Sequence, residues 1–242
     1  IRTTFKMRFL LIRPIEESLA LAQKLEALGH CSVTNPVLTI DAVSPSALDL
    51  TCYQALVFTS AVAVRIFVKH YGVGDLPIYT VGQKTALAAE RLGFRDIQSG
   101  EGDVNKLAQL IKSTADASRG PLLYLSAADI AQDLNELLKD NDYQLDRVIL
   151  YHAKAKTTFE ELTIKALKER KIDYIPFYSS RSALIFKEIT NKTNMTEYLN
   201  QVTALCLSSN IEEKISDLPW KRTLTATRPN EAELFNLIGI GI

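Results

Sequence analysis

Two stretches of the sequence decide the fold: residues 58–67, FTSAVAVRIF, and residues 177–186, FYSSRSALIF. In each, an apolar run ends at a phenylalanine, small hydroxyl-bearing residues follow, and apolar residues then recur at helical spacing. A short bounded apolar run is typical of a buried strand, and hydroxyl residues are preferred at helix N-caps. Both stretches therefore predict a strand that leads straight into a helix, and their similarity indicates an internal duplication.

The same order of elements extends outward from both stretches. Strands are expected at 8–13, 37–41, 54–58, 78–81, 122–125 and 148–151, and helices at 16–28, 64–68, 85–92, 104–111 and 134–138, with a short helical stretch opened by 44–46. The helix after Gly102 has its counterpart in a helix after Pro229. Strands that alternate with helices predict parallel sheets covered on both faces, so the expected fold class is α/β with two similar domains.

Two strand-like runs, 37–43 and 148–155, are candidates for the joints between these domains. No stretch rich in proline, glycine or serine divides the chain, so the joints must be ordinary segments. Both runs have the composition of strands, and we expect them to pair with each other.

The composition excludes several classes of protein. The chain has 242 residues, of which 47% are hydrophobic and 23% charged, as in ordinary globular proteins of two modest domains. Lys plus Arg and Asp plus Glu both total 28, so no net charge attracts nucleic acid or an anionic membrane. Residues 1–11 resemble neither a secretory signal nor a membrane span. We expect a cytoplasmic monomer.

Motifs for several common chemistries are absent from the sequence. Residues 80–86, TVGQKTA, lack the full phosphate-loop pattern, and no dinucleotide fingerprint follows a strand. No serine-hydrolase elbow is present, and the three histidines are not spaced as metal ligands. Cys31, Cys52 and Cys206 are far apart, and we expect buried free thiols rather than disulfides or metal ligands.

Hydroxyl residues follow two of the expected strands, at Thr59-Ser60 and at Ser179-Ser180. The carboxyl ends of parallel strands form the ligand crevice in such sheets, and helix N-termini there can hold carboxylates or phosphates. Helix capping alone is the alternative explanation. Arg13 and Arg181 lie at strand ends too, which suits an acidic ligand or simply a solvated surface. Tyr151 ends a strand at one of the joints, where it either acts on a ligand or covers the joint.

An ordered set of short motifs runs through almost the whole chain. Its members are LIRP at 11–14, FTSAVAV at 58–64, Val81-Gly82 with Thr85-Ala86, Tyr151, FYSS at 177–180, and Ala226 with Pro229. In order and spacing this set resembles the uroporphyrinogen-III synthase family. The resemblance implies two α/β domains joined by a two-stranded β linker, the first domain being discontinuous. The implied limits are 1–35 plus 157–242 for domain 1, 36–41 and 148–156 for the linker strands, and 42–147 for domain 2.

The resemblance also implies an activity in tetrapyrrole and heme biosynthesis. Linear hydroxymethylbilane would lose its terminal hydroxyl as water, invert its last pyrrole ring and close to uroporphyrinogen III in a cleft between the domains, without a cofactor. Tyr151 aligns with the family's candidate for assisting departure of the hydroxyl. The implied substrate contacts are Arg13, Thr59, Ser60, Ala61, Gly82, Thr85, Ser126, Ala127, Tyr178, Ser179, Ser180, Arg181, Ser208 and Ser209. A transient contact with the preceding pathway enzyme is a further expectation.

Two turns depart from the family pattern. The family often has an Arg-Gly turn after the strand at 122–125, where this chain has SAAD at 126–129, and often a glycine where this chain has CLSSN at 206–210. Two other functions stay open at this point. One is a two-lobed cytosolic protein that binds a small anion without changing it, and the other is a catalytically silent family member that serves a tetrapyrrole enzyme as a partner.

Overall fold

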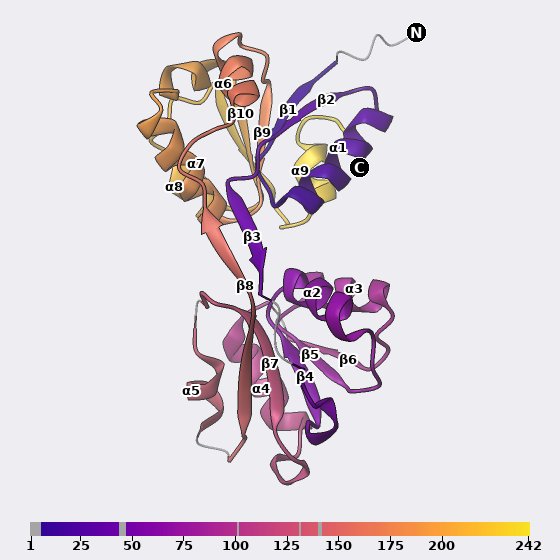
Figure 1. Ribbon diagram of the computed structural model, residues 1–242. Coiled ribbons are helices and arrows are strands. Elements are labelled where there is room, and N and C mark those ends of the chain that lie inside the picture. The colour runs from indigo at the N-terminus through magenta and orange to yellow at the C-terminus, as the bar shows by residue number, and fades with distance from the viewer. Residues whose placement is uncertain (1–5, 44–46, 101, 131, 140–141) are drawn as a thin grey trace. The chain divides into compact units, whose positions relative to one another are not determined.

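The computed structural model describes residues 6–43, 47–100, 102–130, 132–139 and 142–242 (Figure 1). The chain divides into two compact units: unit 1 takes in Ile1–Thr39 with Lys154–Ile242, and unit 2 takes in Ile40–Ala153. Unit 1 is therefore discontinuous, as the family resemblance implies. The helical stretch expected to open at residues 44–46 lies outside the described residues, and a single 3-10 turn, η1 (Leu50–Cys52), follows it.

Among the described residues, unit 1 holds a five-stranded sheet with the strand order β11-β10-β9-β1-β2, in which neighbouring strands are parallel. Its strands are β1 (Arg8–Leu11), β2 (Cys31–Thr34), β9 (Tyr174–Phe177), β10 (Thr203–Cys206) and β11 (Arg222–Thr225). Its helices are α1 (Ile15–Ala27), α6 (Glu161–Lys168), α7 (Ser180–Lys192), η4 (Thr196–Gln201), α8 (Ser209–Ile215) and α9 (Glu231–Asn236).

Both faces of this sheet are covered. Helices α1 and α9 lie on one face and α6, α7 and α8 on the other (Figure 1). Strand β1 shows why: Phe9 and Leu11 pack into the core under α1 and α9, whereas Leu10 and Ile12 pack into the opposite core. Successive side chains of a strand point to opposite faces, so a strand buried on both sides needs the continuous apolar run that β1 has.

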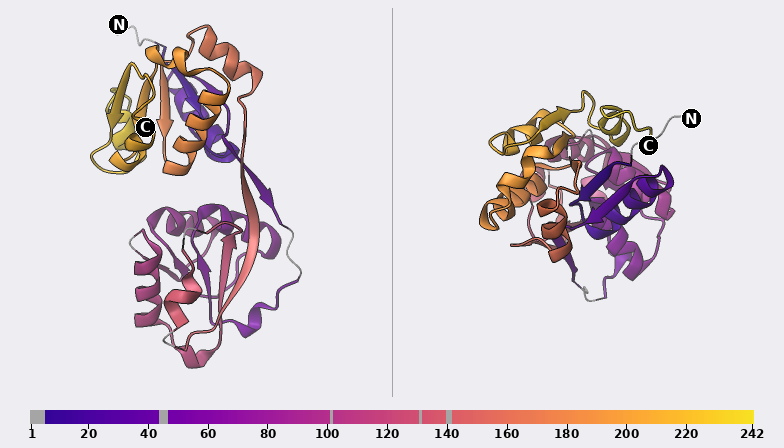
Figure 2. Two further views of the ribbon diagram at one scale, coloured as in Figure 1. Left: turned by 90° about the vertical axis from the view of Figure 1, so that its left-hand side faces the viewer. Right: turned by 90° about the horizontal axis from the view of Figure 1, so that it is seen from above.

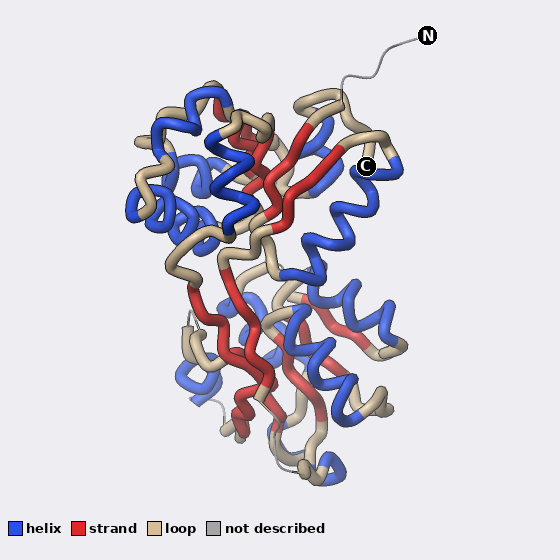
Figure 3. Tube along the Cα trace, turned by 45° about the horizontal axis from the view of Figure 1, so that its top comes forward, coloured by secondary structure: helices blue, strands red, loops and turns tan. Residues whose placement is uncertain are grey.

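Unit 2 repeats this construction. Its sheet has the order β3-β8-β7-β4-β5-β6 in the part of the chain that the structure describes. Its strands are β3 (Leu38–Ala42), β4 (Ala55–Phe58), β5 (Ile78–Thr80), β6 (Ile97–Ser99), β7 (Leu122–Ala127) and β8 (Leu145–Ala155). Its helices are α2 (Ala61–Tyr71), α3 (Gln83–Leu92), α4 (Val104–Thr114), η2 (Ala117–Arg119) and α5 (Leu134–Leu138). Figure 3 shows the strands of each unit between helices.

The two sheets have the same strand order once β3 is set aside. Unit 1 reads β2-β1-β9-β10-β11 and unit 2 reads β8-β7-β4-β5-β6, so β4 corresponds to β9 and β7 to β1. Helix α2 after β4 then corresponds to α7 after β9, and α4 to α9. These correspondences match the sequence repeat of FTSAVAVRIF and FYSSRSALIF, and they confirm two similar α/β domains.

Strands β3 and β8 carry the chain across both unit boundaries. They are neighbours in the sheet and lie side by side in two views (Figures 1 and 2). Val43 N donates to Leu150 O (2.8 Å) and Lys156 N donates to Val37 O (2.9 Å), an order that makes the pair antiparallel. The expected pairing of the two joints is confirmed. Strand β8 also pairs with β7 as far as Tyr151, so much of it belongs to the sheet of unit 2.

The three cysteines are free, as expected. The expectation that all three are buried is wrong, because only Cys206 is buried while Cys31 is half-buried and Cys52 is exposed. Among the described residues, no helix combines the length and the apolar character that crossing a membrane requires.

Candidate functional site

The predicted site residues gather at the carboxyl ends of the strands, separately in each unit. In unit 2 they follow β4 (Thr59, Ser60, Ala61), follow β5 (Gly82, Thr85), end β7 (Ser126, Ala127) or lie on β8 (Tyr151). In unit 1 they follow β1 (Arg13), β9 (Tyr178, Ser179, Ser180, Arg181) and β10 (Ser208, Ser209). Because parallel strands end at one edge of a sheet, each group shares one edge of its own sheet, where open α/β sheets bind ligands.

Ser60 is the centre of the polar group in unit 2. Its backbone is extended, and its Oγ accepts a hydrogen bond from Ala63 N at 3.1 Å, which makes it the N-cap of α2. The same Oγ lies 3.0 Å from the Tyr151 hydroxyl. Tyr151 is only 6% exposed, so its ring is held in the core while its hydroxyl reaches the strand ends. The structure thus brings together two of the predicted residues in one hydrogen bond.

A second tyrosine lies beside this pair. Thr59 Oγ1 is 3.1 Å from the hydroxyl of Tyr124, which is 1% exposed on β7. Burial raises the pKa of Tyr124, and the hydrogen bond from Thr59 partly offsets that rise. Tyr124 is not among the residues predicted for the site. The available signal was a lone tyrosine in the otherwise aliphatic strand 122–125, LLYL, because a buried phenol needs a hydrogen-bond partner.

Tyr151 reaches Ser60 across the end of an intervening strand. The order β8-β7-β4 places β7 between the strands that carry these two residues. Strand β7 ends in Ser126 and Ala127, and Ala127 packs against the same core as Tyr151. The turn that departs from the family pattern therefore lies directly beside the Tyr151 side chain.

Arg147 of β8 holds that turn. Its Nε donates to Ser126 Oγ (2.9 Å), and its Nη2 donates to the carbonyl oxygens of Ala127 (2.8 Å) and Ala128 (2.7 Å). Among the described residues, Arg147 has no carboxylate partner. Arg147 is not among the residues predicted for the site, because nothing in a strand sequence shows which neighbouring turn an arginine side chain will reach.

Gly82 contributes its backbone, and no side chain, to the start of helix α3. It is the N-cap of α3, where Thr85 N donates to its carbonyl oxygen at 3.0 Å. A Cβ at this position would lie 3.0 Å from Gly102 Cα, so a side chain here would require the Gly102 backbone to shift. Thr85 is buried rather than presented to solvent.

The strand ends of unit 1 carry the equivalent helix start. Ser179 Oγ accepts from Ser182 N (3.1 Å) and also bonds Ser182 Oγ (2.9 Å), which makes it the N-cap of α7. Ser208 is at the N-cap position of α8, but its side chain forms no capping hydrogen bond. Ser180 and Ser209 begin their helices, and Arg181 is exposed.

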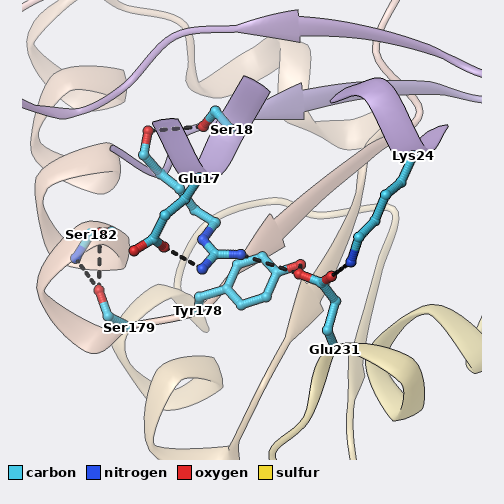
Figure 4. Close-up of polar contacts among 8 residues, drawn as sticks. Glu17, Ser18, Lys24, Tyr178, Ser179, Ser182 and Glu231 are labelled. Atoms are coloured by element: carbon cyan, nitrogen blue, oxygen red, sulfur yellow. Dashed lines mark hydrogen bonds and ion pairs between the residues drawn. The ribbon is translucent and has the colours of Figure 1, made fainter. Parts of the chain in front are cut away.

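Arg13 is neutralised by carboxylates instead of facing an empty crevice. Its guanidinium pairs with Glu17 and, at 3.2 Å, with Glu231, and it stacks over the Tyr178 ring at 3.9 Å (Figure 4). Glu231 also pairs with Lys24 Nζ at 2.5 Å and accepts the Tyr178 hydroxyl at 3.1 Å. Two cations and two carboxylates thus balance within this cluster. The mildly cationic crevice expected from Arg13 does not follow from this arrangement.

These contacts fix the protonation states of the cluster. Burial raises the pKa of Tyr178, and the neighbouring Glu231 carboxylate raises it further. Burial alone would raise the pKa of Glu231, but Lys24, Tyr178 and Arg13 outweigh burial and hold that pKa below its ordinary value. At neutral pH Glu231 is therefore an anion and Tyr178 a neutral hydrogen-bond donor.

The sequence of this chain matches that of a known protein family. The family model described as uroporphyrinogen-III synthase HemD matches residues 20–236, nearly the whole chain. The chain belongs to the uroporphyrinogen-III synthase family. Its resemblance in motif order, stated above on LIRP, FTSAVAV, Tyr151 and FYSS, is thereby confirmed, and the family is one of porphyrin biosynthesis.

Relatives of this synthase family agree in sequence and in fold. The porphyrin biosynthesis protein HemD of Ruminiclostridium josui is 24% identical over 252 residues, which cover 98% of this chain but 49% of that protein. The chain thus spans about half the length of the curated relative it matches. Uroporphyrinogen-III synthetase of Helicobacter pylori has a TM-score of 0.63 at 17% identity, covering 96% of this chain and 98% of the other. A mutant uroporphyrinogen III synthase of Thermus thermophilus gives 0.55 at 16% identity, covering 96% of each chain. At these identities the two structures show the fold alone.

The described residues of this chain contain no group of three or more histidine, cysteine or acidic side chains that could hold a metal ion. The chemistry available at the strand ends is that of hydroxyls, backbone N–H groups and arginines. Such groups donate hydrogen bonds and protons and can hold carboxylates.

Proposed function

We propose that this chain is a uroporphyrinogen-III synthase, which converts hydroxymethylbilane to uroporphyrinogen III with loss of water and inversion of the terminal pyrrole ring. Membership of the family over residues 20–236 supports the reaction class. The observation that carries the proposal is the Ser60–Tyr151 hydrogen bond at the carboxyl ends of the strands in unit 2. It supports the proposal because it holds a buried phenol at the carboxyl ends of the strands, the edge at which open α/β sheets generally bind ligands.

Tyr151 is proposed as the proton donor. The lone pair of the pyrrole nitrogen in the ring that carries the hydroxymethyl group expels the hydroxyl, and a proton from Tyr151 lets it leave as water; the ring at the opposite end of the substrate is the one that attacks and is inverted. Ser60 Oγ then donates its own hydrogen to the phenolate, because that oxygen already accepts Ala63 N–H and retains an O–H. Ring closure through a spiro intermediate releases a proton from the terminal ring carbon, which restores the phenol. The net loss is one water, and the reaction needs no cofactor.

The remaining predicted residues are proposed as substrate contacts. Helices α2 and α7 present their N-terminal N–H groups, and N-termini of this kind hold carboxylates. Thr59 in unit 2 and Ser208 in unit 1 add hydroxyls at the strand ends of their own units. Ser126 is proposed to have a smaller part, because its hydroxyl is buried and already bonded to Arg147 and to Ala127 O. Arg13 contributes a charge to the substrate only by giving up Glu17 or Glu231, so we propose a smaller role for it than for the hydroxyls.

The protein must also direct the product. Spontaneous closure gives the type I isomer, in which the last ring is not inverted. Keeping about 99% of the product as type III requires about 2.7 kcal/mol between the two barriers. A substrate held at several carboxylates by fixed donors can reach this difference through orientation alone.

The test is to supply freshly prepared hydroxymethylbilane, oxidise the products and separate the porphyrin isomers, with the protein, with heat-denatured protein and without protein. We expect a dominant type III product only with the native protein. The type I pattern in all three samples would refute the proposal and leave a silent family member or an anion-binding protein.

A further inference from the structure

Strand β8 contains a β-bulge immediately before Tyr151. In the β7–β8 ladder, Ser126 is opposite Ile149 and the next residue, Ala127, is opposite Tyr151. Leu150 is therefore an extra residue on β8. A bulge of this kind bends the strand and re-aims the side chain that follows, and bulges are frequent beside active sites.

The bulge changes the face to which Tyr151 points. In a regular strand, Leu150 and Tyr151 would lie on opposite faces of the sheet. Instead both pack into the same core, with Leu150 0% and Tyr151 6% exposed. The hydroxyl of Tyr151 meets Ser60 only because the register shifts here.

The turn at the end of β7 holds this bulge from one side. Ala128 N donates to the carbonyl oxygen of Tyr151 at 2.9 Å. The same turn accepts three hydrogen bonds from Arg147, on Ser126 Oγ and on the carbonyl oxygens of Ala127 and Ala128. One guanidinium on β8 therefore clamps the turn that is bonded to the backbone of Tyr151 on the same strand.

We propose that Arg147 is a positioning residue, which locks the bulge of β8 and thereby holds the Tyr151 hydroxyl against Ser60. This inference rests on the role proposed above for Tyr151. The planar guanidinium is suited to the task because its donors diverge in a fixed fork, which a lysine ammonium cannot reproduce.

The experiment compares Arg147→Met and Arg147→Lys with the unchanged protein, in turnover and in the isomer assay. We expect both variants to lower kcat by about 10-fold to 100-fold with a small change in KM, since misplacing a reacting group by about 1 Å has effects of this size. Lysine should not rescue. Full activity in Arg147→Lys would overturn the proposal, because charge alone would then suffice.

A double variant separates positioning from a direct role. If Arg147 acts only through Tyr151, then Arg147→Met adds no further loss of kcat to a Tyr151→Phe protein. Multiplied losses would overturn the inference. Arg222→Met is the matched control, because Arg222 is an exposed strand arginine of unit 1 whose side chain forms no hydrogen bond within the part of the chain that the structure describes. We expect its kcat to stay unchanged.

An NMR measurement made without substrate tests the positioning role of Arg147 separately from the proposed function. In protein labelled with ¹³Cζ-tyrosine, the Tyr151 resonance is assigned by its absence in Tyr151→Phe. We expect Arg147→Met to shift or broaden it, and Arg222→Met to leave it in place. An unmoved resonance overturns the inference even if the enzyme is active, whereas a wild-type protein that makes only type I product refutes the function alone. If Arg147→Met does not fold, Ser126→Ala removes the acceptor of Nε and should move the same resonance less.

Discussion

Helix α2 of unit 2 and helix α7 of unit 1 begin in the same way. Ser60 has φ −150° and ψ 146°, Ser179 has φ −150° and ψ 145°, and each side chain accepts from the N–H three residues later. The surroundings of the two serines differ. Ser60 is hydrogen-bonded to a tyrosine hydroxyl, whereas the strand ends beside Ser179 carry Arg13 balanced by Glu17 and Glu231.

This difference shows what a duplication keeps and what it changes. The strand-to-helix turn is set by backbone geometry and a capping hydroxyl, so both units retain it. The groups around it are free to diverge. In unit 2 they form hydroxyl pairs suited to proton transfer, and in unit 1 they form an ion-pair cluster that holds β1, α1, β9 and α9 together.

The largest expected effect on the difference between the two units is that of Tyr151→Phe, which removes the hydroxyl bonded to Ser60 in unit 2. We expect kcat to fall about 100-fold with little change in KM, because general acid catalysis by a placed side chain contributes about 10²-fold to 10⁴-fold. The measurement is the initial rate at saturating hydroxymethylbilane. Tyr143→Phe is the matched control, since it removes a hydroxyl that donates to Ala115 O (2.8 Å) near the amino end of β8. Equal losses in the two variants would remove Tyr151 from the mechanism.

Arg13→Met tests the structural side of the comparison. It leaves Glu17 and Glu231 partly buried with fewer cations, so we expect the free energy of unfolding of unit 1 to fall by about 2 to 3 kcal/mol. Trp220, the single tryptophan, lies in unit 1 against Phe177 and Phe186, so its fluorescence in urea reports on this unit. Arg222→Met should change the midpoint little. An unchanged midpoint in Arg13→Met would show that the cluster does not stabilise unit 1.

The pH dependence of the same cluster follows from Glu231. Its folded-state pKa is lowered, so its stabilising effect is present above the ordinary glutamate pKa of about 4.3 and is lost as pH falls through the lower folded-state value. Glu231→Gln should therefore lower the free energy of unfolding by about 1 to 2 kcal/mol at pH 7. The gap between variant and wild type should close on acidification. Urea titrations followed by Trp220 at several pH values measure it, and a constant gap would contradict the assignment.

Much of the fold could be predicted from the sequence because its central strands carry unmistakable signals. Strands β1, β4 and β7 are buried on both faces and therefore read as continuous apolar runs. Strands β2, β6, β10 and β11 were not predicted. Three of them, β2, β6 and β11, lie at sheet edges and are only partly buried, whereas β10 is a buried strand of only four residues. Half-exposed strands of three or four residues, such as CSVT and RTLT, give little periodicity.

The position of the candidate site residues in the fold was predictable, but their contacts were not. Hydroxyl residues after β4 and β9 indicated the strand ends, and the structure places them there. The bond between Ser60 and Tyr151 depends on a bulge and on the order β8-β7-β4, neither of which leaves a local signal. The neutralisation of Arg13 depends on Glu231, far away in the sequence.

The smallest expected effect is the most direct comparison of the units, Ser60→Ala against Ser179→Ala. Each change removes one N-cap hydrogen bond, and we expect each to lower the free energy of unfolding by about 1 kcal/mol. Urea titration followed by circular dichroism measures both. Similar losses would confirm that the two caps are equivalent in the fold.

The same two variants should then differ in kinetics. Ser60→Ala also removes the partner of the Tyr151 hydroxyl, so we expect kcat to fall about 10-fold, whereas Ser179→Ala should act through KM because only a proposed substrate contact is lost. If both variants changed kcat equally, the hydroxyl beside Tyr151 would have no special role, and the two units would share the chemistry. If Ser60→Ala alone lowered kcat, the catalytic role of Ser60 would come from its hydrogen bond to Tyr151 on the bulged strand β8, and not from the capping role that it shares with Ser179.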